Sequence, residues 1–433
     1  MYTKTFQELV NIMHHDYAGC IDKKDWDNPK PYEEEIRSLE NKGGLTANQF
    51  SEIVQDYLLD FKDPHLFFNL INSNSQKEYD NGFRVRRYKD KLYVTTLTNE
   101  TRLKLGDAIL SLDQIPVLEL VEKHQREFRE PKAEREDWRK VTSKYNVAEV
   151  MDTKGNIRLL ELKKYEKAEF KQQHTIKLIG NDTLHMTLSD FLEPKPIDTL
   201  LEKHKEDLEK TKNLIIDVRT NLGGSTLSYK TLEKYLFPSG KNKINFNFYN
   251  MKVNCTKRNA DLIIKFINEE LEKNENEEYR EGLKRWKEQT WEKHRGKGFV
   301  NFDNESSDGE YEITGLDFPE NIIVLADNYC GSAGDIFVYL CKQSPKITII
   351  GRPTMGVNDY SNLSKMVWDN QFELMYATSR LDQLDNRQLG AEQGIKPDVY
   401  IPWTPKHIDK DIDMEEAMKL LLENTCSNNE VRS

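Results

Sequence analysis

The stretch that most constrains the fold runs from Ile322 to Phe337 and reads IIVLADNYCGSAGDIF. Its first five residues are apolar, which predicts a buried strand, and the apolar spacing beyond the glycines predicts a helix. A tight turn between strand and helix presents a side chain at the carboxyl edge of a sheet, beside unpaired N–H groups. Ser332 lies in that turn and is a candidate nucleophile. The alternative is that Ser332 simply caps the helix, because serine is a favoured N-cap residue.

A second buried strand ends in a pair of glycines. The segment NLIIDVRTNLGGS (Asn213–Ser225) follows an alternating strand, DTLHMTLSDF, and an amphipathic helix, PIDTLLEKHKEDLEK. Strand, helix and strand in that order predict a parallel crossover unit of an α/β fold. Gly223 and Gly224 permit backbone conformations closed to other residues and let a main chain approach a ligand closely.

The amino-terminal part predicts helices and places a histidine at their end. Residues 1–62 show apolar side chains at helical spacing, and Thr46 is the predicted N-cap of the last helix. That helix should end near Asp63, because the residue before Pro64 is pushed out of the helical region. His65 follows, ahead of a predicted strand, LFFNL. A side chain at such a junction can be aimed into a cleft.

Changes in pattern divide the chain into five parts. We expect an N-terminal helical domain carrying His65 (1–75), a module of short strands (76–178), an α/β core (179–240 and 318–405), a charged helical insertion (241–317), and a C-terminal helix and tail (406–433). In the second part, LKLGDAILSLDQIPVLELVEKH resembles the second half of a PDZ domain, with a glycine–aspartate turn, a strand and a small turn before a helix. The tract Asn301 to Gly309 predicts a mobile loop.

Composition restricts the partners. A net charge of -11 argues against nucleic acid, because phosphate binding needs a basic face. No run approaches the ~18 apolar residues of a membrane span and the amino end lacks a secretory signal, so we expect a cytoplasmic protein without a membrane partner. Five cysteines show no CxxC pairing, which argues against a disulfide framework or a zinc site. Cys330, close to Ser332, is expected to pack as a small apolar residue.

Four blocks in one order resemble a known family. LIIDVRTNLGG (Leu214–Gly224) resembles the LIIDLRxNxGG block of the C-terminal processing peptidases, the serine protease family that includes tail-specific proteases and the tricorn core. IIVLADNYCGSAGDIF resembles the family's nucleophile block, IIGRPTMG (Ile349–Gly356) its GxxTxG turn, and GIKPDVYI its GVxPDxxV block. The resemblance covers most of the chain except residues 241–317.

The resemblance implies a fold and an activity. It implies a crotonase-like core of the ClpP/crotonase type, with an N-terminal helical domain and a PDZ-like module. It also implies a serine endopeptidase that cleaves flexible or C-terminal segments of a peptide or unfolded protein, without metal or cofactor. Ser332 matches the nucleophile. The oxyanion donors match the backbone N–H groups of Gly223 and Ala333.

The general base separates two branches of the family. One branch takes a lysine from a GxxTxGKG turn, but this chain has Val357 there, and valine cannot accept a proton. The other branch, which includes the tricorn core, takes a histidine from just after the amino-terminal helices, and His65 matches it. An imidazole can deprotonate a serine at neutral pH and later protonate the leaving amine. The serine that precedes the tricorn histidine is replaced here by Pro64.

The group that orients the histidine stays open among three carboxylates. The tricorn branch uses a glutamate before the GVxPD block, and Glu392 in AEQGIKPD is the candidate. Its spacing to the glycine is one residue shorter than in the common pattern, so Asp359 and Asp335 are alternatives. Asp335 also has the place of a helix-start charge favoured by the helix dipole.

Two rival functions accompany the peptidase hypothesis. The same fold occurs in retinoid-carrying proteins, so the chain could be a catalytically inactive family member that binds a peptide or a small hydrophobic molecule. A PDZ-type binding scaffold with a purely structural core is the other rival. If a fluorophosphonate formed no adduct with Ser332, either rival would be favoured over the peptidase.

Overall fold

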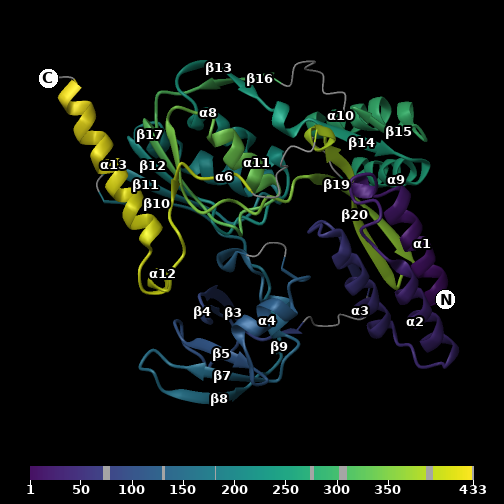
Figure 1. Ribbon diagram of the computed structural model, residues 1–433. Helices are drawn as coiled ribbons and strands as arrows, with labels where there is room; N and C mark the ends of the chain where they lie inside the picture. Colours follow the sequence, from purple (N-terminus) through teal and green to yellow (C-terminus); the bar gives the residue numbers. More distant parts are fainter. Residues whose placement is uncertain are drawn as a thin grey trace. The chain divides into compact units, whose positions relative to one another are not determined.

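A computed structural model describes residues 1–71, 79–128, 132–180, 182–273, 277–301, 310–386 and 394–431 (Figure 1). The chain divides into two compact units, and each is described by itself below. The first, here named the His65 unit, comprises Met1–Ser75, Asn245–Tyr311 and Val357–Glu392. The second, the Ser332 unit, comprises Gln76–Ile244, Glu312–Gly356 and Gln393–Ser433.

The His65 unit begins with helices whose ends follow from the sequence. They are α1 (Tyr2–His15), α2 (Pro29–Asn41) and α3 (Ala47–Leu58). The predicted cap of α3 is confirmed: Thr46 Oγ1 accepts the Gln49 N–H at 3.2 Å, and Gln49 Oε1 accepts the Thr46 N–H at 3.1 Å. A 3-10 turn, Leu59–Phe61, continues α3 until Lys62 leaves the helical conformation with φ 47°. The helical part therefore ends just before Asp63 and Pro64.

An antiparallel sheet forms the other layer of this unit. Its order is β1-β20-β14-β15, and β19 pairs with β20. The bounds are β1 (Phe67–Leu70), β14 (Met251–Cys255), β15 (Gly298–Asn301), β19 (Tyr360–Trp368) and β20 (Phe372–Leu381). Phe6, Phe50 and Phe68 are buried between the helices and the sheet, and the Phe68 and Phe372 rings stack at 5.5 Å. Each fully buried side chain of this size contributes roughly 1.5–3 kcal/mol, so this aromatic cluster holds the helices on the sheet.

The predicted helical insertion supplies both helices and strands. α9 (Lys257–Lys273) and α10 (Glu277–Trp286) carry its helical pattern, and α10 runs into a π-helical turn (Lys287–Glu292) that buries Trp291. β14 and β15 flank these helices, and β14 pairs with β20. Strands of 5 and 4 residues are too short to show a clear period. Residues 302–309 of the predicted loop lie outside the described residues.

The Ser332 unit is built on a sheet of order β10-β11-β12-β17-β18-β21. β10 and β11 pair antiparallel, and the remaining neighbours pair parallel. The bounds are β10 (His174–Ile179), β11 (Thr183–Leu188), β12 (Asn213–Asp217), β17 (Asn321–Ala326), β18 (Ile347–Gly351) and β21 (Val399–Tyr400). The predicted crossover is confirmed, because β11 and β12 are parallel and α6 (Pro194–Lys203) lies between them in sequence.

Helices cover both faces of this sheet (Figure 1). On one face, α13 (Ile412–Val431) packs Ala417 and Leu421 against Ile323 and its strand neighbours. On the other face, Phe337 of α11 (Ala333–Cys341) contacts the Phe191 and Tyr229 rings. Further short helical segments are α7 (Lys205–Leu208), a 3-10 helix (Thr226–Leu232), α8 (Glu233–Leu236) and α12 (Lys406–Asp409).

A separate antiparallel sheet forms what we name the strand module of this unit. Its order is β3-β4-β5-β7-β8, with β6 paired to β5. The bounds are β3 (Phe83–Tyr88), β4 (Lys91–Leu97), β5 (Ala108–Leu112), β6 (Ile115–Pro116), β7 (Val147–Met151) and β8 (Ile157–Glu161), with helices α4 (Val117–Lys123), η3 (Ala133–Arg135) and α5 (Arg139–Thr142). Trp138 is buried in its core. Two further sheets have two strands each: β2 (Tyr79–Asp80) pairs with β9 (Tyr165–Glu166), and β13 (Gly240–Asn245) pairs with β16 (Glu310–Gly315).

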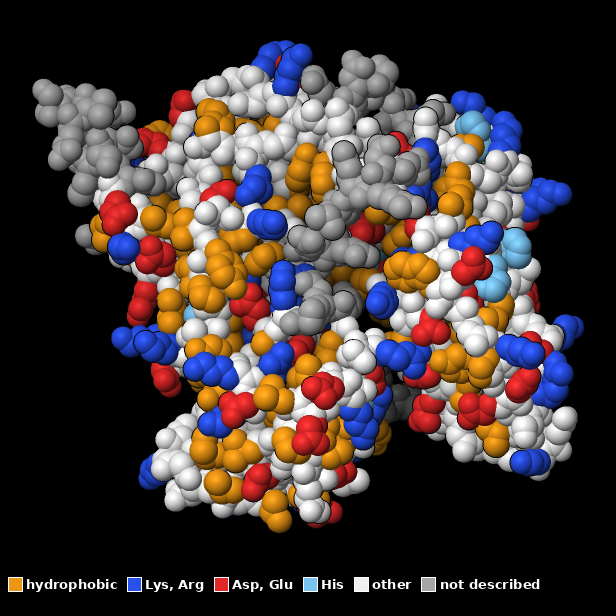
Figure 2. All heavy atoms as spheres, viewed as in Figure 1, with side chains coloured by type: hydrophobic (Ala, Val, Ile, Leu, Met, Phe, Trp, Pro, Cys, Tyr) orange, Lys and Arg blue, Asp and Glu red, His pale blue; other side chains and the backbone are white. Residues whose placement is uncertain are grey.

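The surface carries both signs of charge. On the face shown in Figure 2, Lys and Arg side chains are interspersed with Asp and Glu side chains. Within the part of the chain that the structure describes, no helix is long and apolar enough to cross a membrane.

Candidate active site

Ser332 lies in a strained turn between β17 and α11. It is the N-cap residue of α11, with φ 57° and ψ -120°. An ordinary N-cap residue has an extended backbone, and a positive φ at a residue with a side chain is destabilising by about 1–3 kcal/mol. A strained serine in the turn between a buried parallel strand and a helix is typical of α/β enzymes with a serine nucleophile. Ser332 is therefore the N-cap of α11 and forms a capping box with Asp335, but its backbone conformation departs from that of an ordinary cap.

Asp335 holds this turn from the first turn of α11. Its carboxylate is fully buried, and Oδ2 accepts the Ser332 N–H at 2.9 Å. Oδ1 accepts the N–H of Gly356, at the end of the RPTMG loop, also at 2.9 Å. One carboxylate thus connects the nucleophile turn to the loop after β18, a role that the dipole argument for Asp335 does not include.

Gly223 lies directly against Ser332. With φ +83°, it occupies a conformation that favours glycine, and a Cβ placed there would lie 2.7 Å from Ser332 Cβ and 2.6 Å from the Gly331 carbonyl oxygen. Its N–H donates to Asn221 Oδ1 at 2.9 Å, and Asn221 Nδ2 donates to the Leu188 carbonyl at 3.0 Å. The buried Asn221 amide, which offers no sequence signal beyond its place in the block, therefore sets the glycine turn beside the serine.

The two predicted oxyanion donors differ in their present partners. The Gly223 N–H is engaged by Asn221. For the Ala333 N–H, the hydrogen bonds of the described residues include no acceptor. Ala333 is the first residue of α11, where helical N–H groups lack intrahelical partners. Of the two predicted donors, the Ala333 N–H could therefore donate to an oxyanion without first giving up another acceptor, whereas the Gly223 N–H would have to give up or share Asn221.

Cys330 is not a competing nucleophile. Its side chain is fully buried, and burial raises the pKa of the thiol well above its usual value. Gly334 packs against its Sγ, since a Cβ on that glycine would lie 2.8 Å away. A reactive cysteine needs a lowered pKa and access to solvent, so Cys330 packs as a small apolar residue.

In the other unit, His65 is oriented through both its backbone and its ring. The His65 N–H donates to Asp63 Oδ1 at 2.8 Å, which closes a turn over Pro64. The ring nitrogen Nδ1 lies 2.7 Å from the Tyr360 carbonyl oxygen. A carbonyl can only accept, so Nδ1 carries the proton and Nε2 of the neutral ring holds the lone pair. His65 is thus in the tautomer that a general base with a reactive Nε2 requires.

The groups that orient His65 are themselves held in the core of that unit. Tyr17 donates its hydroxyl to Asp63 Oδ2 at 2.7 Å, and burial together with Asp63 raises the pKa of Tyr17 well above its usual value, so the hydroxyl keeps its proton. The Tyr360 hydroxyl donates to Asp22 at 3.2 Å, and Arg380 donates to both oxygens of Asp22 at 2.7 and 2.6 Å. The sequence indicated neither Asp63 nor Tyr360 as a functional residue. Asp63 could have been found from the Asx turn that Asp-Pro-His favours, whereas a backbone carbonyl leaves no signal.

The three carboxylates proposed to orient His65 have different positions. Glu392 lies outside the described residues. Asp335 belongs to the Ser332 unit and bonds backbone N–H groups there. Asp359 is buried in the His65 unit, directly before Tyr360.

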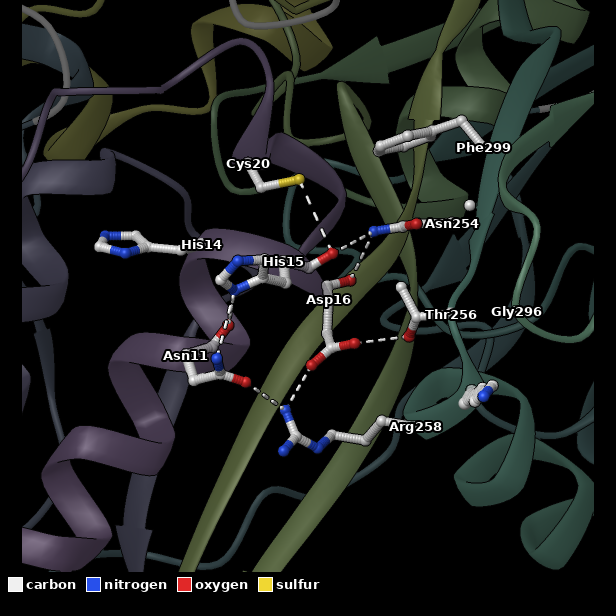
Figure 3. Close-up of a pocket in the computed structure, with 12 residues that line it drawn as sticks. Asn11, His14, His15, Asp16, Cys20, Asn254, Thr256, Arg258, Gly296 and Phe299 are labelled. Carbon is white, nitrogen blue, oxygen red and sulfur yellow. Dashed lines mark hydrogen bonds and ion pairs between the residues drawn. The ribbon is translucent and has the colours of Figure 1, made fainter.

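A cavity of about 630 Å³ in the His65 unit has no part in this chemistry (Figure 3). It lies where α1 meets β14 and the start of α9, and several of its polar groups bond one another. Thr256 Oγ1 donates to Asp16 at 2.5 Å, Arg258 also pairs with Asp16, and Asn254 Nδ2 donates to the His15 carbonyl at 2.9 Å. Neither Ser332 nor His65 lines it.

The family of the chain follows from its sequence. Residues 182–401 match the model of peptidase family S41, and this match spans half of the 433 residues. The chain therefore belongs to peptidase family S41, whose members are serine-type peptidases. No curated protein sequence matches the chain.

Several solved structures are similar to this chain at 12–13% sequence identity. A serine-to-alanine mutant of CPAF has a TM-score of 0.67 at 13% identity, covering 97% of this chain and 96% of that chain. Mature CPAF complexed with lactacystin has a TM-score of 0.66 at 12% identity, covering 97% of each chain. The photosystem II D1 C-terminal processing protease has a TM-score of 0.45 at 13% identity, covering 94% of each chain. The likeness to CPAF shows a shared mixed α/β fold.

Proposed function

We propose that this chain is a serine endopeptidase that hydrolyses peptide bonds in flexible or C-terminal segments of proteins through an acyl-enzyme on Ser332. The observation that carries the proposal is the strained Ser332 backbone, bonded to Asp335 and packed on Gly223, within the region that matches the family model. Strain persists at a position only where the surrounding structure enforces it, and such positions gather at functional sites.

His65 is proposed as the general acid and base. Nε2 removes the proton from Ser332 Oγ as Oγ attacks the substrate carbonyl carbon, and the resulting Nε2–H protonates the leaving amine when the C–N bond breaks. The released fragment carries the new amino end. Water then loses a proton to Nε2 and attacks the ester, which frees the acid and restores the Ser332 hydroxyl. The Nδ1–H bond to the Tyr360 carbonyl supports this role because it leaves Nε2 as the basic nitrogen.

The negative charge that develops on the substrate oxygen needs N–H donors. We assign Ala333 as the first donor and Gly223 as the second, whose N–H would share its proton between Asn221 and the oxyanion. A preorganised donor of this kind is worth roughly 3–4 kcal/mol in the transition state. Glu392 stays a proposed orienter of the imidazole.

We also propose roles for the parallel sheet of the Ser332 unit and for the strand module. The parallel sheet with its flanking helices is proposed to be a crotonase-like core, and the strand module to be a PDZ-like unit that binds or positions peptide. A cytoplasmic location stays a proposal.

Labelling with a fluorophosphonate tests the nucleophile. We expect one adduct, located at Ser332 by peptide mass spectrometry, and no adduct in Ser332→Ala. Ser344→Ala is the matched control, because Ser344 is a buried serine of the same unit whose hydroxyl donates to the Leu236 carbonyl. Casein cleavage by a folded Ser332→Ala variant would show that another residue is the nucleophile.

The base is tested with the same label. His65→Ala should slow adduct formation at Ser332 and casein cleavage by about 100-fold or more, while His15→Ala, a histidine of α1 in the same unit, should slow neither. Labelling of Ser332 at the wild-type rate in His65→Ala would reject His65 as the base.

Substrate selection needs its own comparison. Two versions of one peptide, with a free and with an amidated carboxyl end, separate C-terminal recognition from cleavage of any flexible segment. Equal cleavage of both versions, with a folded globular protein left intact, is the result expected for an endopeptidase that selects flexible segments. Cleavage of the folded protein at the same rate would reject that selectivity.

A further inference from the structure

Charged residues follow the carboxyl ends of the central parallel strands. β12 ends at Asp217, β17 at Ala326 and β18 at Gly351, and the register aligns these ends. Because parallel strands end at the same sheet edge, the next charged residues along the chain meet there. They are Arg219 after β12, Asp327 after β17 and Arg352 after β18.

One carboxylate from the C-terminal helix joins two of these residues. Asp413, in the first turn of α13, accepts from Arg352 through both oxygens at 2.6 and 2.7 Å. It also accepts from Arg219 Nη1 at 3.1 Å. Arg352 continues to Asp327 at 2.7 Å, and Asp327 in turn pairs with Arg86 of β3 at 2.6 Å. We name Asp413, Arg219, Arg352, Asp327 and Arg86 the strand-end network.

Four of the five residues of the strand-end network are buried, and Arg219 is partly exposed. Asp413 is fully buried, and Arg352 is 2% exposed. Burial alone would raise the pKa of Asp413, but His407 at 3.5 Å, the hydrogen bonds from Arg352 and the charge of Arg219 outweigh it and hold the pKa well below its usual range. Removing one partner of such a pair leaves an uncompensated buried charge, which forces the remaining groups to move.

The three network residues that follow strand ends, Arg219, Arg352 and Asp327, each lead into a segment that builds the serine site. Arg219 lies two residues before Asn221, which bonds the Gly223 N–H. Arg352 opens the loop that ends at Gly356, the second partner of Asp335. Asp327 starts the turn to Ser332, and its carbonyl accepts the Cys330 N–H at 2.9 Å. Asp413 therefore contacts the arginines at the base of two of these loops and reaches the third through Arg352.

We propose that Asp413 is a positioning residue for peptide hydrolysis, so that the C-terminal helix α13 is part of the catalytic apparatus. It touches neither substrate nor reacting atoms. Through Arg219 and Arg352 it sets the glycine turn and the Asp335 loop against Ser332. This inference rests on the proposed function of Ser332. A misplacement of about 1 Å in such a site can lower the rate by about 100-fold.

The experiment compares four variants of the full chain with the wild type. Asp413→Asn removes the charge, and Asp413→Glu keeps it with one more methylene. The pair Asp413→Leu with Arg352→Met replaces the buried ion pair with apolar side chains, a change that is often neutral for stability. Glu100→Gln is the matched control, since Glu100 is a 2% exposed carboxylate of the strand module paired with Arg102 at 2.5 Å.

Three measurements separate positioning from general stability: kcat and KM on a casein-derived peptide, the rate of fluorophosphonate labelling at Ser332, and the midpoint of urea unfolding. We expect Asp413→Asn and the apolar pair to lower kcat and the labelling rate by roughly 10- to 100-fold with KM changed less than about twofold. Asp413→Glu should recover part of both rates. Glu100→Gln should lower the unfolding midpoint without changing either rate.

Two results would overturn the inference. One is an apolar pair that folds with the wild-type midpoint and keeps the wild-type kcat. The other is an equal loss of kcat in Asp413→Asn and Glu100→Gln at equal loss of stability, which would mean that α13 acts through stability alone. If Ser332→Ala abolishes hydrolysis while the Asp413 variants keep it, only this inference fails. If Ser332→Ala still hydrolyses the peptide, the proposed function fails.

Discussion

The conformation of Ser332 depends on a neighbour that has no side chain. Gly223 leaves the space in which Ser332 Cβ and the Gly331 carbonyl lie, and its positive φ turns the chain away from β12. Any larger residue meets both atoms at less than van der Waals distance. The glycine pair therefore matters for the shape of the site in addition to any hydrogen bond to an oxyanion.

Gly223→Ala should consequently impair both activity and stability. The new methyl group would lie 2.7 Å from Ser332 Cβ, and the φ of +83° adds roughly 1–2 kcal/mol of strain for alanine. We expect kcat/KM to fall by at least about 10-fold, measured on a peptide substrate. Gly155→Ala is the control, because Gly155 has φ +88° and a Cβ there would meet nothing within 4 Å. Equal effects of the two substitutions would show that strain, not contact with Ser332, is responsible.

Asp63 is a second residue expected to affect catalysis indirectly, because it positions His65. Its two oxygens separately hold the His65 N–H and the Tyr17 hydroxyl. Asp63→Ala removes both acceptors and leaves a buried phenol without a partner, which is destabilising by roughly 1–3 kcal/mol. We expect kcat to fall about 10-fold with His65 no longer fixed. Asp56→Ala, which removes a partner of Tyr32 from α3, should leave kcat unchanged, and a wild-type kcat in Asp63→Ala would exclude this role.

Between elements, the strand module and the serine site are joined by arginine side chains. Arg135, at the end of η3, donates to the carbonyl oxygens of Pro353, Thr354 and Met355 at 3.1, 2.8 and 2.9 Å. The Met355 N–H donates to the Cys330 carbonyl at 2.6 Å. A short helix of the module thus supports the loop that lies behind Ser332.

Arg135→Ala should therefore lower activity more than stability. The loop loses its donors and its carbonyls turn to water, so we expect kcat/KM to fall by roughly 10-fold and the urea midpoint to change little. Arg158→Ala is the control, since Arg158 of the same module donates to the Arg102 carbonyl at 2.5 Å and is 42% exposed. Should both variants retain full activity, the contact from η3 is not needed for catalysis.

The elements differ in how well the sequence predicted them, for physical reasons. The parallel strands and the Ser332 turn were predictable because buried apolar runs next to glycines have few alternatives. β14 and β15 were not, because they are short and lie beside long helical patterns. The position of Tyr360 against His65 depends on the start of β19 meeting the segment after α3, 295 residues apart in sequence, and a carbonyl group is common to every residue. Asn221 and Asp335 stood in the predicted blocks, but only coordinates show which N–H groups they accept. Glu392 stays a prediction.

For the molecule as a whole, the buried carboxylates predict how stability depends on pH. Burial alone would raise the pKa of Asp327, but Arg86 and Arg352 outweigh it and hold the pKa well below its usual range. The pKa of Asp413 is lowered in the same way. A carboxylate whose folded-state pKa is depressed contributes stability that is present above its unfolded pKa and is lost as the pH falls toward the folded one.

The free energy of unfolding should accordingly begin to fall below about pH 5 and continue to fall on further acidification, because the unfolded chain binds protons at a pH where the folded chain does not. Asp327→Asn should be less stable at pH 7 by about 3–5 kcal/mol, because it breaks a buried pair, and its stability should decline less steeply on acidification. Urea unfolding followed by tryptophan fluorescence at several pH values measures both. Parallel declines in the wild type and the variant would contradict the assignment of this pH dependence to Asp327.

The place of Asp413 in the chain bears on when a newly made molecule could become active. During synthesis the ribosome releases the strands β12, β17 and β18, with Arg219 and Arg352, well before it releases the carboxylate that joins them. Under the proposed role of Asp413, a nascent chain holds the serine turn but lacks the contact that sets it. Such an order of synthesis would keep the peptidase idle until α13 has left the ribosome, and would protect the unfolded segments made before α13 from cleavage while they are most exposed.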